Sequence, residues 1–353
     1  MNIKIIFEGD YKQIGLQHGR FLKDDISKTL ETYIGMWGIP QEKIPCAVSG
    51  FKKIITDEYP HLAEEIRGIS EGSGIDEDFI YAINSRTELF SGSSSQECTS
   101  VGVPSSSHDQ GHIVLAQNWD WYSHFRDLAK VVELRPDGKL RLKMLVEPGM
   151  VGKIGMNEAG LGVCMNFLPT EQIDAGGVPV HVVLRNILEC EDYSSAEKYV
   201  FNARRAASAN YLLGHKNGNV GGLETTPEDV RVVSPNPLIS HTNSYTVRGE
   251  SCLRNKLFDL VASSCLGRSL EHKMSTDEVN RALNLVRFPR ASRLEMGFFD
   301  CIRRVCEKFG LSYAHLFYGR CETVRRVNLD LTEGILSVSS GAKADPFAVH
   351  RFN

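Results

Sequence analysis

The chain has 353 residues, of which 42% are hydrophobic and 24% charged, as is typical of a globular enzyme with a large core. Its formal net charge of -4 provides no electrostatic basis for binding nucleic acid or an anionic membrane. The nine cysteines are scattered without a C-x-x-C pair, which argues against a zinc ribbon and indicates a reducing compartment.

The two ends of the chain carry no recognisable targeting signal. Residues 1–7 turn polar too soon for a signal peptide, and the last three residues are not a peroxisomal signal. No run of about 18 apolar residues is present, so we expect no membrane span. We therefore predict a cytoplasmic protein that binds neither nucleic acid nor membrane.

The first ninety residues are predicted to be mostly helical. Apolar residues recur at helical spacing after a short initial strand, and Asp76 is a plausible N-cap. The predicted elements are a strand at 3–7 and helices at 11–37, 48–58, 61–71 and 76–90.

From residue 98 onward the pattern changes to strands joined by hairpin turns, such as Pro136-Asp-Gly138 and Asn217-Gly218. Because the strands follow one another and the helices come in blocks, we predict a layered α+β protein with antiparallel sheets. Strands are expected at 98–103, 113–118, 129–134, 140–145, 152–156, 161–166, 210–213, 220–224, 230–233, 315–318, 323–328 and 335–338. Helices are expected at 181–189, 195–201, 252–262, 276–286 and 298–308.

Cys98 is the first candidate for chemistry, because it joins a tether to the first of these strands. The tether, residues 91–97, is polar and rich in serine and glycine. A catalytic cysteine needs a base, and an N-terminal cysteine would carry one in its own α-amino group, with an ordinary pKa of about 7.7–8.0. The alternative is that Cys98 is one buried structural cysteine among nine.

Short motifs follow one another in a fixed order from residue 14 to residue 243. They are Ile14-Gly-Leu-Gln-His-Gly19, Glu64-Glu-Ile-Arg-Gly-Ile69, Asn84-Ser-Arg-Thr-Glu88, Glu97-Cys-Thr-Ser100, Gln117-Asn-Trp-Asp120, Gly152-Lys-Ile-Gly-Met-Asn157, Ala159-Gly160, Gly177-Val-Pro179, Leu184-Arg185, Gly222-Leu-Glu224 and His241-Thr-Asn243. Together they resemble the acyl-coenzyme A:isopenicillin N acyltransferase family. This is peptidase family C45 of the N-terminal-nucleophile hydrolases, which includes N-β-alanyl-dopamine hydrolase.

The resemblance implies a four-layer αββα sandwich and a precursor that cuts itself before Cys98. Residues 1–97 would form an α chain and residues 98–353 a β chain, which stay together as one domain. The thiol of Cys98 would attack the carbonyl of a small-molecule amide, with no metal or organic cofactor. The resemblance is also compatible with a homo-oligomer.

Two further residues match functional positions of the family. Asp120 would orient the new amine of Cys98, although a carboxylate that caps a strand end is the structural alternative. Asn243 would donate an N–H group to the oxyanion, although an asparagine that caps its own turn is the alternative. The glycines beside His18 are expected to allow close helix packing.

The remaining candidates have weaker support. Arg86 and Glu88 lie just before the tether and are expected to form an ion pair at a helix end that holds the tether. Asn118, Trp119, Glu224 and His241 are expected to be structural. Possible substrate contacts are Trp121, Tyr122, Asn166, Phe167 and Ser312.

Glu97 stands where the family's penicillin enzyme has glycine, and a side chain there is expected to slow self-cleavage. The first functional hypothesis is a self-processing cysteine amidohydrolase acting on a small N-acyl or N-aminoacyl amide. The alternatives are an acyl-coenzyme A-dependent N-acyltransferase, and an unprocessed binding protein without enzymatic activity.

Overall fold

Strand pairing organises the chain around two sheets. The computed structural model describes residues 5–90, 97–170, 173–235, 237–243, 245–246, 273–285, 321–339 and 347–352. Within these residues, the first sheet has the order β1 (Ile5–Gly9), β4 (Lys130–Pro136), β5 (Leu142–Val146), β6 (Ile154–Asn157), β7 (Leu161–Phe167), β8 (Ala209–His215), β9 (Val220–Thr225) and β10 (Val230–Val233). The second has the order β11 (Ile239–His241), β2 (Glu97–Val103), β3 (Val114–Tyr122), β12 (Cys321–Asp330), β13 (Ile335–Ser339) and β14 (Ala348–Arg351).

Neighbouring strands in both sheets are antiparallel, except that β1 runs parallel to β4. The sheets pack face to face, with β2 and β3 against β7 and β8. Gln117 in β3 bonds both backbone groups of Met165 in β7, at 2.6 and 2.9 Å. The polar side chains between the sheets therefore fix the position of β3 relative to β7.

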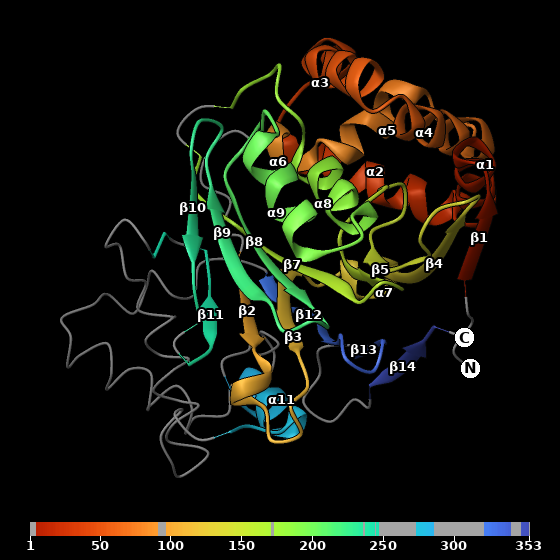
Figure 1. Cartoon of the computed structure of the whole chain (residues 1–353). Helices are drawn as coiled ribbons and strands as arrows, with labels where there is room; N and C mark the ends of the chain where they lie inside the picture. The colour runs from red at the N-terminus through yellow and green to blue at the C-terminus, as the bar shows by residue number, and fades with distance from the viewer. Residues whose placement is uncertain are drawn as a thin grey trace, which may run out of the picture.

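Helices cover the outer faces of the two sheets (Figure 1). Over the first sheet lie α1 (Tyr11–Phe21), α2 (Lys23–Trp37), α3 (Ile44–Glu58), α4 (Pro60–Ser73), α5 (Glu77–Asn84), α6 (Arg86–Leu89), α8 (Val180–Glu189) and α9 (Tyr193–Asn202). Helix α11 (Thr276–Leu285) packs on β3 of the second sheet, and the short α7 (Phe125–Leu128) follows β3. Single 3-10 turns occupy Gln41–Lys43 and Ser105–Ser107. The layers are helix, sheet, sheet, helix, so the predicted αββα sandwich is confirmed.

Helices α1 and α4 touch backbone to backbone, as the glycines of the sequence predict. A Cβ atom on Gly15 would lie 2.0 Å from the carbonyl oxygen of Glu65, and one on Gly68 would lie 2.3 Å from that of Lys12. His18 of α1 stacks on Phe7 and accepts the N–H of Gly149 at 3.0 Å. Burial lowers the pKa of His18 to about 3, so this histidine is a neutral part of the core.

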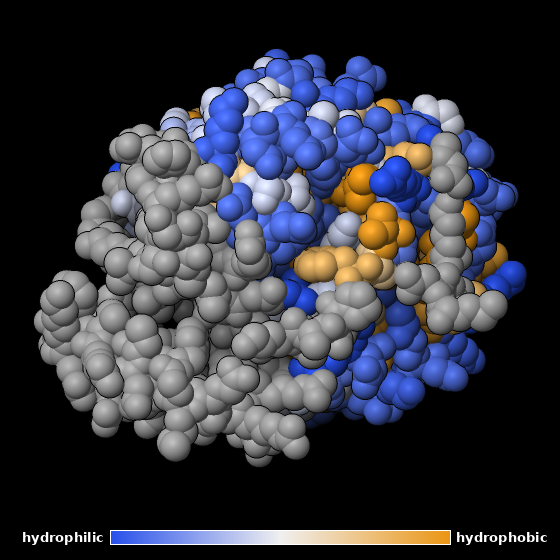
Figure 2. Space-filling model, turned by 90° about the horizontal axis from the view of Figure 1, so that it is seen from below, coloured by the Kyte–Doolittle hydropathy of each residue, from blue (hydrophilic) through white to orange (hydrophobic). Residues whose placement is uncertain are grey.

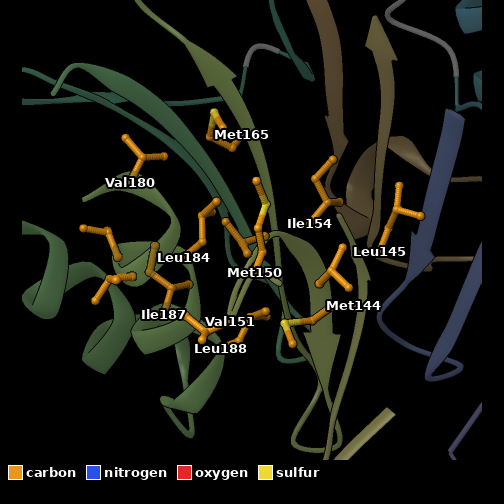
Figure 3. Packing of buried hydrophobic residues seen from close by; sticks show 14 of the residues in the cluster. Met144, Leu145, Met150, Val151, Ile154, Met165, Val180, Leu184, Ile187 and Leu188 are labelled. Carbon is orange, nitrogen blue, oxygen red and sulfur yellow. The ribbon is translucent and has the colours of Figure 1, made fainter. Parts of the chain in front are cut away.

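The core beneath α8 extends to the middle of the sandwich. Figure 3 shows Leu184, Ile187 and Leu188 of α8 directed toward Met150 and Val151. Ile154 of β6 and Met165 of β7 continue this layer toward the second sheet. The described part of the face shown in Figure 2 is mostly hydrophilic, with a group of apolar residues on its right-hand side.

Several predicted boundaries were wrong. The helix predicted at 11–37 breaks at Leu22, where the backbone leaves the helical region (φ -110°, ψ 19°), and the helix predicted at 76–90 breaks at Ser85. Apolar periodicity continues across both breaks, so it does not reveal a change of helix axis. Asp76 is the predicted N-cap, and its carboxylate accepts the N–H of Asp78.

The strand predicted to end at residue 118 runs on to Tyr122, because β2 and β12 pair with it on both sides. Strands β11 and β14 and helix α7 were not predicted from the sequence. The elements predicted at 252–262, 298–308 and 315–318 lie outside the described residues.

Candidate active site

Cys98 is the second residue of β2, in the interior of the second sheet. Cys98 is 7% exposed and lies opposite Trp119 in the register of β2 and β3. Its backbone N–H donates to Oδ1 of Asn243 at 2.5 Å. The residue that the sequence marks as nucleophile is therefore held from two distant parts of the chain.

The thiol of Cys98 is protonated at neutral pH. Burial, followed by the charge of Asp120, raises its pKa to about 11. Hydrogen bonds from the backbone N–H of Asp120 and from the side chain of Gln117, together with the charge of Lys153, act in the opposite direction. Nucleophilic attack by this sulfur therefore requires a base that accepts its proton.

Asp120 lies one position beyond Trp119 and pairs with Glu97 across the two strands. It is fully buried, and its Oδ1 accepts a hydrogen bond from the hydroxyl group of Thr323 in β12. Two neighbouring strands thus hold this carboxylate close enough for its charge to act on the thiol of Cys98.

Asn243 follows β11 and joins β2 to the end of β7. Its Nδ2 donates to the carbonyl oxygen of Phe167 at 2.9 Å, while Oδ1 accepts from Cys98. The segment that carries it is anchored by His241, whose Nε2 lies 2.8 Å from Oε1 of Glu224. That carboxylate also accepts the N–H of Thr246 at 2.6 Å. The arrangement places a carboxamide beside the backbone nitrogen of Cys98.

A small cavity, with room for about one water molecule, lies beside the thiol. It is lined by Arg86, Cys98, Gln117, Trp119, Asp120, Trp121, Lys153, Ile154, Met165 and Phe167. Trp121 and Phe167, two of the residues proposed from the sequence as substrate contacts, are part of its wall. Tyr122 packs edge-on against Trp121, with ring centroids 5.2 Å apart.

Asn166 lies between the sheets, where its side chain bonds Ser100 at 2.6 Å and Asn210 at 3.2 Å. These contacts tie β7 to β2 and β8, and the structure does not bring Asn166 into the wall of the cavity. Ser312 lies outside the described residues.

Arg86 and Glu88 do not form the predicted ion pair with each other. Arg86 bonds Glu147 at 3.1 Å and lies over the rings of Tyr33 and Trp121. Glu88 accepts the N–H of Val180 at 2.8 Å through Oε1. The short helix α6 points the two side chains toward different parts of the core, which the spacing in the sequence does not reveal.

A buried charged cluster near the thiol was not predicted from the sequence. Glu147 is fully buried and binds Arg86, Lys153 and the hydroxyl group of Tyr33. Lys153 also lies over the ring of Trp119, 3.1 Å from its centroid. Lys153 is part of one of the family-like motifs, but only the fold shows that it reaches the cavity.

In the part of the chain that the structure describes, no cluster of three or more histidine, cysteine, aspartate or glutamate residues is arranged to hold a metal ion. None of the helices in the described ranges is both long enough and apolar enough to cross a membrane.

Comparison with known proteins places the chain in a family. Residues 106–293 match the family model described as Acyl-coenzyme A:6-aminopenicillanic acid acyl-transferase. The chain belongs to this acyltransferase family. The 40 kDa form of acyl-coenzyme A:6-aminopenicillanic-acid-acyltransferase from Emericella nidulans is 28% identical over 250 residues, covering 68% of this chain and 69% of that protein.

Among solved structures, the chain is similar to a single-residue variant of conjugated bile acid hydrolase from Clostridium perfringens. It has 12% identity and a TM-score of 0.49, over 72% of this chain and 97% of that one. Penicillin V acylase from Agrobacterium tumefaciens has 11% identity and a TM-score of 0.45, over 71% and 84% of the two chains. As a member of the acyltransferase family, the protein is an enzyme that acts on amide bonds by hydrolysis or acyl transfer.

Proposed function

We propose that the protein is a self-processing cysteine amidohydrolase that cleaves a small N-acyl or N-aminoacyl amide through a thioester on Cys98. The observation that carries this proposal is the convergence on Cys98. Asn243 bonds its nitrogen, the N–H of Asp120 bonds its sulfur, and a small cavity lies beside the thiol. A buried structural cysteine would not need this arrangement.

Maturation would begin at the bond between Glu97 and Cys98. The sulfur of Cys98 attacks the carbonyl carbon of Glu97, the bond from that carbon to nitrogen breaks, and the nitrogen takes up a proton. Water then hydrolyses the thioester, which leaves a carboxylate on Glu97 and a free amine and thiol on Cys98. That amine has an ordinary pKa near neutrality and would serve as the base in substrate turnover.

The two products of the cut would stay together. Residues before the cut supply β1 of the first sheet and helices α1 to α6, whose apolar faces form part of the common core. Separation would expose this apolar surface to water, which costs a free energy of about 25 cal/mol for each Å² exposed. The α and β chains would therefore behave as one domain.

In the mature enzyme, Asp120 would orient the amine of Cys98 from the neighbouring strand. The carboxamide of Asn243 already lies beside that nitrogen, and a small movement would direct its N–H group at the oxyanion. Trp121, Phe167, Ile154 and Met165 line the small cavity beside the thiol and would contact an apolar or aromatic acyl group once the cavity widens to admit it.

The first test asks whether the chain cuts itself. Intact mass and a denaturing gel of the purified protein should show two pieces, residues 1–97 and 98–353, and Cys98→Ala should remain a single 39.3 kDa chain. A wild-type protein that stays in one piece would instead support the hypothesis of an unprocessed binding protein.

The second candidate is acyl transfer from acyl-coenzyme A to an amine. The family and the relative from Emericella nidulans are both named for this activity. The two functions share every residue assigned here and differ in the acceptor of the acyl group. Incubation of the mature protein with phenylacetyl-coenzyme A, with and without an amine, separates them: a new amide shows transfer, whereas release of the acid alone shows hydrolysis.

A further inference from the structure

Lys153 lies on the same side of the second sheet as the nucleophile. Cys98 and Trp119 are directly opposite each other in antiparallel strands, so their side chains project from the same face, with Cβ atoms about 4.5–5.5 Å apart. The ammonium group of Lys153 lies over the ring of Trp119, 3.1 Å from its centroid. Both Lys153 and Cys98 line the cavity.

Lys153 is one of two cations that share one carboxylate. Glu147 binds Lys153 and Arg86, and the hydroxyl group of Tyr33 donates to its other oxygen. All four side chains are buried, with Lys153 1% exposed. If Lys153 lost its proton, the charge of Arg86 would still balance Glu147. The cluster can therefore release one proton without leaving a buried charge unpaired.

Burial lowers the pKa of Lys153 to about 7, and the charge of Arg86 acts in the same direction, whereas Glu147 raises it. A sizeable fraction of this amine is neutral at physiological pH, which is the condition for an efficient general base.

The intact precursor lacks the base that the mature enzyme would use. Before the chain is cut, the nitrogen of Cys98 belongs to an amide and cannot accept a proton. The charge of Asp120 raises the pKa of the thiol and disfavours the thiolate, whereas the charge of Lys153 favours it. A protonated Lys153 therefore stabilises the sulfur anion that proton transfer to it creates.

We infer that Lys153 is the general base of self-cleavage. This inference rests on the proposed function. The neutral amine of Lys153 accepts the thiol proton as the sulfur of Cys98 attacks the carbonyl carbon of Glu97. The resulting ammonium returns the proton to the nitrogen of Cys98 as the carbon–nitrogen bond breaks, so that the thioester and the free amine form without net loss of a proton.

The charged groups around Lys153 define the pH dependence. Two neighbouring groups do not titrate between pH 5.5 and 9, because the pKa is about 2 for Glu147 and about 3 for His181. The pKa of the Cys98 thiol, about 11, lies above this pH range. Arg86, Tyr33 and Asp120 are further charged or ionisable groups close to the site. Glu88, near Arg86, also has a pKa of about 7, so its variant serves as the matched control.

The experiment follows cleavage of the full chain. The precursor is made by in vitro translation at pH 5.5 and transferred to buffers from pH 5.5 to 9, and splitting is followed on denaturing gels. The wild-type rate should rise with pH and level off above about pH 7. Lys153→Arg, which keeps the positive charge but cannot act as a base, should split at least about 100-fold more slowly, without an inflection near pH 7. Glu88→Gln should keep the inflection.

A rescue experiment shows whether a variant splits slowly because it lacks the base or because it does not fold. Splitting of Lys153→Ala should speed up in proportion to added ethylamine, which can enter the space left by the side chain and replace the base. The inference is overturned if Lys153→Arg splits within threefold of wild type with the same pH profile, or if the wild-type rate shows no inflection. A wild-type chain that never splits would refute self-processing itself, and the role of Lys153 with it.

Discussion

The substitution Glu147→Gln tests the buried charged cluster most directly. It removes the carboxylate that binds Arg86, Lys153 and Tyr33, and leaves the buried guanidinium group of Arg86 without this counter-charge. Removal of one partner from a buried ion pair costs about 3–5 kcal/mol. Burial alone would raise the pKa of Glu147. The positive charges of Arg86 and Lys153 outweigh this effect and lower the pKa from 4.5 to about 2. This shift corresponds to about 3 kcal/mol of stability at pH 7.

The sign of the pH dependence follows from the lowered pKa. A carboxylate with a lower pKa in the folded state stabilises the protein above its unfolded value, and this contribution disappears as the pH falls from 4.5 toward 2. We therefore expect Glu147→Gln to lower the free energy of unfolding by about 3 kcal/mol at pH 7. The difference from wild type should shrink as the pH falls below 4.5.

Urea unfolding in the Cys98→Ala background, which keeps the chain in one piece, measures this difference. Glu158→Gln is the matched control, because Glu158 forms a partly exposed pair with Arg141 at 2.6 Å and should contribute less than about 1 kcal/mol. A loss below about 1 kcal/mol in Glu147→Gln at pH 7, equal to that of the control, would refute the assignment of Glu147 as the shared counter-ion.

Three other predictions concern the site and its support. Asn243→Ala should lower kcat of the mature enzyme about 10²–10³-fold, and an unchanged kcat would exclude Asn243 as an oxyanion donor. Asp120→Asn should lower the pKa of the Cys98 thiol, because Asp120 raises it; the rate of alkylation by iodoacetamide, followed against pH by peptide mass, measures this shift. Gly68→Ala should lower Tm, since its Cβ would meet backbone at 2.3 Å, whereas Gly35→Ala, with open space around it, should raise Tm. Equal effects of the two substitutions would contradict the close packing of α1 on α4.

Local patterns predicted much of the fold. Apolar residues at helical spacing predicted the helices of the first ninety residues. Short apolar segments bounded by turn residues predicted most strands of the first sheet. These signals depend on neighbours a few positions apart, which the sequence displays directly. The breaks at Leu22 and Ser85 were missed because the apolar spacing continues across them. Strands β11 and β14 were missed because they are short and lie at the edges of the second sheet.

In the candidate site, too, the sequence marks individual residues, whereas the fold decides which of them meet. The position of Cys98 after a polar tether, and the family-like motifs that contain Asp120 and Asn243, mark these residues in the sequence itself. Only the fold shows that Asn243 reaches the nitrogen of Cys98 across 145 positions, and that Lys153 shares Glu147 with Arg86 beside the thiol. Spacing along the chain carries no information about these contacts, because the pairing and packing of two sheets decide which buried charges meet.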